Sequence, residues 1–155
     1  MVCVRIEKQQ VVKPPFSEKS RRVIARALEV AERQRVNYIT TDQLVWGLMQ
    51  DDGIQEMIQL ANLEGIRTEL NATIVKTLGT RSEGEIMCSE TTDKVLERAG
   101  EVSRERGACA TEPIDILAAV FLEDCTTAQM LERSGVNFDT LKSFLSHPTA
   151  RQQKP

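Results

Sequence analysis

The side chains that could do chemistry in this sequence are few and widely separated. The 155 residues contain one histidine, His147, and four cysteines, Cys3, Cys88, Cys109 and Cys125, which never form a C-x-x-C pair. Metal sites and catalytic nucleophile-base pairs need several such groups in a defined arrangement. No G-x-x-x-x-G-K-[ST] or G-x-G-x-x-G stretch is present to bind phosphate groups. We therefore expect no catalytic site, no metal site and no cofactor, and we expect reduced thiols with structural or incidental roles.

Charged side chains are numerous but scattered. The formal net charge is -3, with 20 Lys and Arg residues interleaved with 23 Asp and Glu residues, so no continuous positive face is available for nucleic acid. The acidic pairs at 51–52 and 123–124 fall at predicted helix ends, where solvated charge explains them better than a cation site. No apolar run approaches the roughly 18 residues of a membrane span, and residues 1–10 lack the apolar core of a signal peptide. We expect a cytoplasmic protein that binds neither nucleic acid nor membrane.

Apolar side chains recur at helical spacing along most of the chain. Ser17 can cap the first helix, and Thr40 or Thr41 can cap a second helix whose apolar face includes Trp46. We expect Trp46 to pack in the core and Tyr38, in the preceding loop, to be a contact residue. Four helices are predicted in the first half, over residues 17–34, 41–51, 54–61 and 66–78.

The same pattern starts again 72 residues later. Aligning Ser17 with Ser89 pairs Val23 with Val95 and continues without a gap through the second helix of each half. An ungapped match across two helices and a loop indicates a duplication. We expect an all-α fold in which two four-helix repeats pack as one pseudo-twofold domain. The predicted parts are an N-terminal arm (1–15), a first repeat (16–79), a linker (80–87), a second repeat (88–147) and a tail (148–155).

The repeated unit resembles a known family. The segments F-S-E-K-S-R-R-V-I-A-R-A-L-E-V-A and N-Y-I-T-T-D-Q-L-V-W-G-L-M are similar to the first repeat of the Clp N-terminal (Clp R) domain of AAA+ unfoldases. The segments I-D-I-L-A-A-V-F-L-E and A-Q-M-L-E-R-S-G-V resemble the second repeat, nearer to the ClpA type than to the ClpC type. The resemblance covers Phe16 to about His147 and does not include the ATPase modules.

The resemblance implies a protein-binding module without enzymatic activity. In this family the domain docks adaptor proteins, or unfolded or degron-bearing substrates, for an ATP-driven unfoldase. The family's adaptor-facing surface corresponds here to Asn37, Tyr38, Thr41, Asp42 and Gln43. The usual Glu-His pair of the family is replaced by Asp-Gln at the last two of these positions. The second-repeat equivalent of Asp42 is Ile114, which cannot pair with a guanidinium, so the phosphoarginine recognition of ClpC-type domains is not expected.

Two other functions are compatible with the sequence to different degrees. A free-standing regulatory or assembly protein that binds the Clp ATPase or protease itself fits a chain of this length. A helix-turn-helix regulator is suggested by the short helix pairs but is disfavoured by the net charge of -3.

Overall fold

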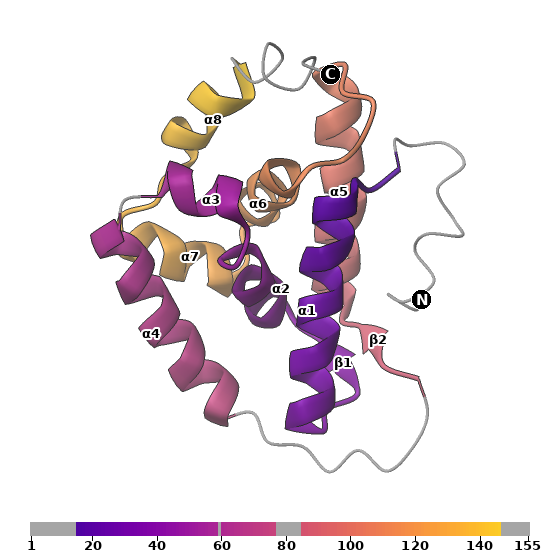
Figure 1. Ribbon diagram of the computed structural model, residues 1–155, viewed down its shortest axis with the longest axis vertical. Coiled ribbons are helices and arrows are strands. Elements are labelled where there is room, and N and C mark those ends of the chain that lie inside the picture. Colours follow the sequence, from indigo (N-terminus) through magenta and orange to yellow (C-terminus); the bar gives the residue numbers. More distant parts are fainter. Residues whose placement is uncertain (1–14, 59, 77–84, 147–155) are drawn as a thin grey trace.

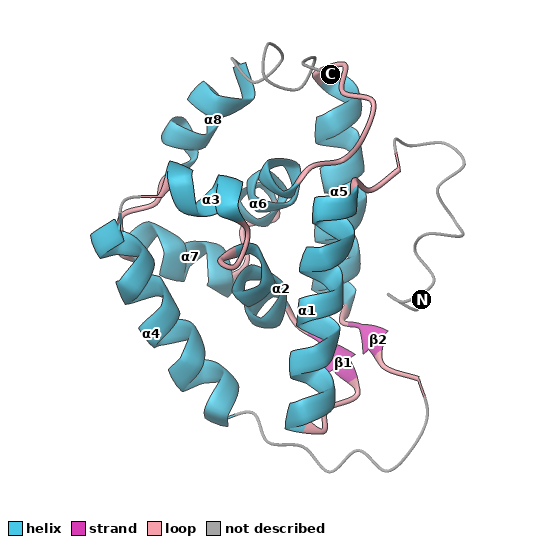
Figure 2. Cartoon of the chain, in the orientation of Figure 1, coloured by secondary structure: helices cyan, strands magenta, loops and turns pink. Residues whose placement is uncertain are grey.

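A computed structural model describes residues 15–58, 60–76 and 85–146, and most of them are helical (Figures 1 and 2). The predicted all-α double repeat is confirmed, with four helices from each half of the chain. The first half contributes α1 (Glu18–Gln34), β1 (Tyr38–Ile39), α2 (Thr41–Leu48), α3 (Asp52–Met57) and α4 (Leu60–Lys76). The second half contributes β2 (Met87–Cys88), α5 (Glu90–Glu105), α6 (Pro113–Leu122), α7 (Thr126–Arg133) and α8 (Phe138–Ser146).

Residues 72 positions apart occupy matching places in the two repeats, and we call them repeat mates. The Ser17 hydroxyl accepts from the backbone N–H of Ser20 at the start of α1, and its mate Ser89 accepts from Thr92 at the start of α5. The predicted cap at Thr40 is also present, because its hydroxyl accepts from the backbone of Gln43. These local bonds satisfy backbone donors that a helix leaves unpaired in its first turn.

The core lies where the second helix of each repeat meets the other elements. Helix α1 packs along α2, and α5 packs along α6, while α1 also contacts α6 and α2 contacts α5. Val23 of α1 and its mate Val95 of α5 are fully buried, as are Leu44 and Ile116 of the central helices. Trp46 is half-buried and packs against this core. The two repeats therefore share one hydrophobic core.

Two short parallel pairings join the repeats, and the helical periodicity did not indicate them. Strand β1 pairs with β2, with Ile39 opposite Cys88. A single bridge joins Phe16 to Thr111, which are the repeat mates of Cys88 and Ile39. The segment before the second helix of each repeat is thus held against the segment before the first helix of the other. Tyr38, which we expected in a loop, lies in β1.

The third and fourth helices differ in their bounds from the prediction. The predicted helices over 54–61 and 66–78 leave a break at residues 62–65, yet α4 runs through this stretch, which includes Gly65. Leu63, Ile66 and Leu70 are buried along one face of α4, and this continuous apolar stripe outweighs the modest helix penalty of one glycine. Several predicted parts lie outside the described residues, namely the arm apart from Pro15, Gly79, the first part of the linker (80–84), His147 and the tail. Met87 of the predicted linker lies in β2.

One expectation about the cysteines is wrong. Cys88 is disulfide-bonded, whereas Cys109 and Cys125 are free thiols. Sequence spacing could not reveal the bond, because a disulfide depends on the distance between two backbones in the folded chain. None of the described helices combines the length and the hydropathy needed to cross a bilayer.

Candidate protein-binding site

The predicted adaptor-facing residues divide into an exposed and a buried group. Asn37 is exposed, and the Tyr38 side chain is 53% exposed. Asp42 is half-buried, whereas Thr41 and Gln43 are buried at 8% and 1% exposure. The side chains of Asn37, Tyr38 and Asp42 are therefore accessible to a partner. The buried side chains of Thr41 and Gln43 hold the segment in place.

Gln43 is buried because it completes the start of α2. Its Oε1 accepts from the Thr40 backbone N–H at 3.0 Å, while the Thr40 hydroxyl accepts from the Gln43 N–H at 3.4 Å. This reciprocal arrangement is a capping box. It fixes the direction in which the chain enters α2, and it thereby fixes the neighbouring Thr41 and Asp42.

A hydrogen-bond relay ties the same segment to the second repeat. The Thr127 hydroxyl of α7 donates to Asp42 Oδ1 at 2.7 Å, and the hydroxyls of Thr41 and Thr127 lie 2.7 Å apart. Since the Thr127 proton goes to the carboxylate, Thr41 must be the donor to Thr127. Nothing in the sequence signals this relay, because Thr127 is 85 or more positions from the two residues that it contacts. The carboxylate is oriented by a residue of the other repeat.

The repeat mate of this segment, at the start of α6, carries different chemistry. Asp115, the mate of Gln43, is fully buried and accepts from the Glu112 backbone N–H at 2.8 Å. It also accepts from Arg106 Nε and Nη2, both at 2.7 Å. In the first repeat the mates of this ion pair are Gln34 and Gln43. The charge pattern of the sequence predicts that Arg106 lies on a solvated helix surface, and this prediction is wrong, because its side chain is only 11% exposed and pairs with Asp115 nine positions later.

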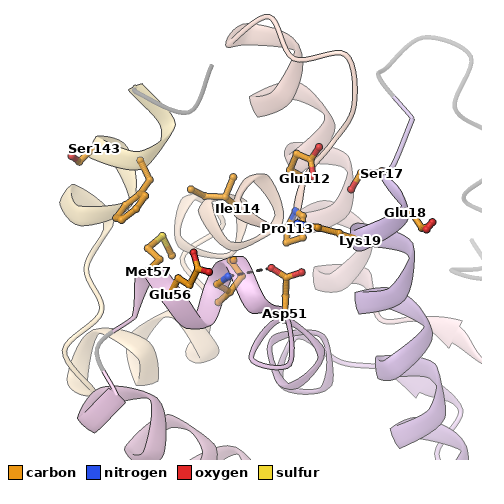
Figure 3. Close-up of a pocket in the computed structure, with 13 residues that line it drawn as sticks. Ser17, Glu18, Lys19, Asp51, Glu56, Met57, Glu112, Pro113, Ile114 and Ser143 are labelled. Carbon is orange, nitrogen blue, oxygen red and sulfur yellow. Dashed lines mark hydrogen bonds between the residues drawn. The ribbon is translucent and has the colours of Figure 1, made fainter. Parts of the chain in front are cut away.

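An open cleft of about 770 Å³ lies beside the start of α6 (Figure 3). Its walls come from the first turns of α1 and α6, from α3 and from α8. Ile114, the mate of Asp42, lies in this cleft with Met57 and Phe144, and all three are half-buried. The remaining lining residues are Ser17, Glu18, Lys19, Asp51, Gly53, Ile54, Glu56, Glu112, Pro113 and Ser143. Sequence reasoning singled out Ile114 only as a lost acidic position and did not find the cleft.

The cleft and the predicted surface are related by the repeat but differ in shape and charge. At the predicted surface α7 lies against α2, and Thr127 bonds to Thr41 and Asp42. At the cleft the corresponding α3 also contacts α6, and residues of both helices line the opening. Within the described residues, no group of three or more His, Cys, Asp or Glu side chains is arranged to hold a metal ion.

Comparison with known proteins agrees with this architecture. The N-terminal domain of Hsp104 from Candida albicans superimposes with a TM-score of 0.75 at 19% identity, covering 89% of this chain and 93% of that one. The N-terminal domain of ClpD, a chaperone associated with caseinolytic protease, from Arabidopsis thaliana gives 0.65 at 21% identity, covering 90% and 97%. A structure from a malarial protein secretion system gives 0.78 at 10% identity, covering 89% and 97%. At these identities the similarity shows a common fold.

The sequence itself identifies the family. No curated protein sequence gives a significant match to this chain. Residues 15–133, however, match the family described as the Clp repeat (R) N-terminal domain. This span includes both capped helix pairs, the relay and most of the cleft. The chain belongs to the Clp repeat (R) N-terminal domain family.

Proposed function

We propose that this protein is a protein-binding module of the Clp protease and chaperone system, docking adaptors or substrate proteins for an ATP-dependent unfoldase. Membership of the family supports this proposal. The observation that carries it is the exposed Tyr38 in the same short segment as Asp42, whose carboxylate is held by Thr127. We further propose that the chain is nearer to the ClpA type than to the ClpC type, because Ile114 replaces the second-repeat acid of the ClpC type.

The proposed contact surface consists of Asn37, Tyr38 and Asp42. An exposed tyrosine offers a large, rigid contact area with a polar end, and such side chains are common anchors in protein interfaces. A carboxylate that is already oriented loses little entropy when it accepts from a basic or amino group of a partner. Thr41 and Gln43 support this surface from within through the relay and the capping box.

Affinity capture tests the proposal. Immobilised wild-type protein and the variant Tyr38→Ala with Asp42→Arg are incubated with a lysate of the source cells, and bound proteins are identified by mass spectrometry. We expect Clp adaptors, substrates or unfoldase subunits on the wild-type protein and strong depletion on the variant. The control is Glu105→Arg, a charge reversal at an exposed position near the end of α5. Equal recovery on wild type and variant would exclude this surface.

A further inference from the structure

Helix α2 leaves one line of its side chains accessible. Between Thr41 and Gln50, the residues Asp42, Trp46 and Gln50 are half-buried, and all the others are buried. Residues four positions apart lie on the same face of a helix. These three side chains therefore form one line along α2 and the turn after it, which we call the α2 stripe. Because Asp42 belongs to the proposed contact surface, the stripe continues that surface toward the other end of α2.

Trp46 occupies the middle of the α2 stripe. Its repeat mate in α6 is Ala118, which is fully buried. The first repeat thus places a large, partly accessible indole where the second repeat has a covered methyl group. A partly exposed tryptophan gains free energy when a partner covers it, and tryptophan is a common anchor in protein interfaces.

Two arginines border the far end of the α2 stripe. Helix α2 lies between α1 and α4 and packs against both (Figure 1). From α1, Arg26 Nη1 donates to the Gly47 carbonyl at 3.4 Å, and from α4, Arg67 Nη2 donates to the Met49 carbonyl at 3.5 Å.

Both guanidinium groups keep donors for a partner. In the described part of the chain, Arg26 makes no ion pair, and Arg67 pairs only with Glu64, at 3.5 Å. A guanidinium carries five N–H donors, and both arginines are only half-buried. This end of the stripe therefore favours a carboxylate.

The spacing along the stripe matches an extended polypeptide. Asp42 and Trp46 are four positions apart, which is about 6 Å along the axis of a helix. Successive residues of an extended segment are about 3.3 Å apart, so side chains on the same face are about 6.6 Å apart. Alternate side chains of one segment can thus meet the acid, the indole and the arginines in turn.

We propose that the α2 stripe binds one extended segment of a partner protein in which alternate side chains are basic, bulky apolar and acidic. The basic group pairs with Asp42, the apolar side chain covers Trp46, and the carboxylate pairs with Arg26 or Arg67. The inference rests on the proposed protein-binding function and adds to it the residues and the partner chemistry that determine specificity.

Titration of the intrinsic fluorescence of Trp46 tests this inference, because Trp46 is the only tryptophan in the sequence. The probe is Ser-Lys-Ser-Phe-Ser-Glu-Ser-Gly with acetylated and amidated ends, which carry no terminal charge. Three comparison peptides replace Glu by Gln, Lys by Gln, or Phe by Ala. We expect a saturable change in Trp46 emission with the probe and binding weaker by roughly fivefold or more with each comparison peptide. Binding should also weaken as salt is raised.

Matched variants connect the binding to the stripe. Arg26→Gln with Arg67→Gln should weaken binding of the probe roughly tenfold and leave the affinity for the peptide that lacks Glu almost unchanged, because the exposed ion pairs are lost. The control, Arg104→Gln with Arg133→Gln, removes the same charge at exposed positions of α5 and α7 and should change neither affinity. Far-ultraviolet circular dichroism verifies that each variant is folded.

The outcomes separate this inference from the proposed function. Equal affinity for the probe and the peptide that lacks Glu, unchanged binding in Arg26→Gln with Arg67→Gln, or binding without a change in Trp46 emission overturns the inference. Absence of binding by all four peptides overturns it as well. In each of these cases, lysate capture that is lost in Tyr38→Ala with Asp42→Arg still supports the proposed function.

Discussion

The buried ion pair between Arg106 and Asp115 should contribute more to the stability of this domain than any exposed pair. Two hydrogen bonds of 2.7 Å join the guanidinium to the carboxylate, and the two side chains are 11% and 0% exposed. Removing one partner leaves the other charge in the interior without compensation, which costs about 3–5 kcal/mol. Asp115→Gln isolates this term, because a glutamine can still accept from the Glu112 backbone N–H as Gln43 does from Thr40.

The first repeat supplies the matched double variant. Arg106→Gln with Asp115→Gln installs in the second repeat the Gln34 and Gln43 pair of the first. Both charges are then absent, so no buried charge is left alone, and we expect a loss of only about 1–2 kcal/mol. The control is Arg22→Gln, which removes the exposed 3.0 Å pair with Glu18 and should cost less than about 1 kcal/mol.

Urea unfolding at neutral pH, followed by far-ultraviolet circular dichroism, measures the free energy of unfolding of each variant. Domains of this size have total stabilities of about 5–15 kcal/mol, so the loss in Asp115→Gln should move the midpoint strongly. A loss below about 1 kcal/mol in the single variant would refute the reasoning. A double variant as unstable as the single one would refute it too, because the unpaired charge would then not be the cause.

Three further predictions concern individual positions. Arg35 ends α1 with φ of 58° where its mate Gly107 has 74°, so Arg35→Gly should stabilise by about 0.5–1 kcal/mol and Gly107→Ala should destabilise by about 1 kcal/mol; chemical denaturation checks both signs. A Cβ on Gly47 would lie 2.5 Å from the Val23 carbonyl oxygen, whereas one on Gly65 would meet nothing within 4 Å. Gly47→Ala should therefore destabilise the fold by about 1–3 kcal/mol, and Gly65→Ala should stabilise it by about 0.5–1 kcal/mol, as measured by thermal unfolding. Burial, followed by the charge of Glu97, raises the pKa of Asp93, so this carboxylate destabilises the fold once ionised; Asp93→Asn should stabilise at neutral pH, and the gain should vanish as the pH falls below the pKa of the unfolded chain, a trend measurable by unfolding across that range.

Local sequence signals predicted the helical scaffold. A serine or threonine hydroxyl reaches a backbone N–H only two or three residues ahead, so Ser17 and Thr40 could be identified as caps before the fold was known. The duplication was visible because both repeats must bury the same helix faces. The boundary between α3 and α4 was not predicted well, because Gly65 is tolerated on an exposed face once the opposite face is buried.

The candidate site was predicted only in part. The family resemblance predicted that the site lies in the segment 37–43. It did not predict that Thr41 and Gln43 are buried. Whether a polar side chain faces solvent or a partner within the fold depends on what packs over it, and Thr127 comes from the other repeat. The strand pairing and the disulfide of Cys88 are non-local in the same way.

The sequence by itself determined that this chain forms two capped, amphipathic four-helix repeats, since each helix depends on contacts within a few residues. Only the tertiary structure decided which distant side chains come together. Residues as far apart as Glu18, Ile114 and Phe144 line one cleft, whereas at the repeat-mate position Thr127 of α7 bonds to Thr41 and Asp42. The physical reason is that packing two similar but unequal units leaves small differences in helix position, and these are set by the whole core rather than by any local pattern.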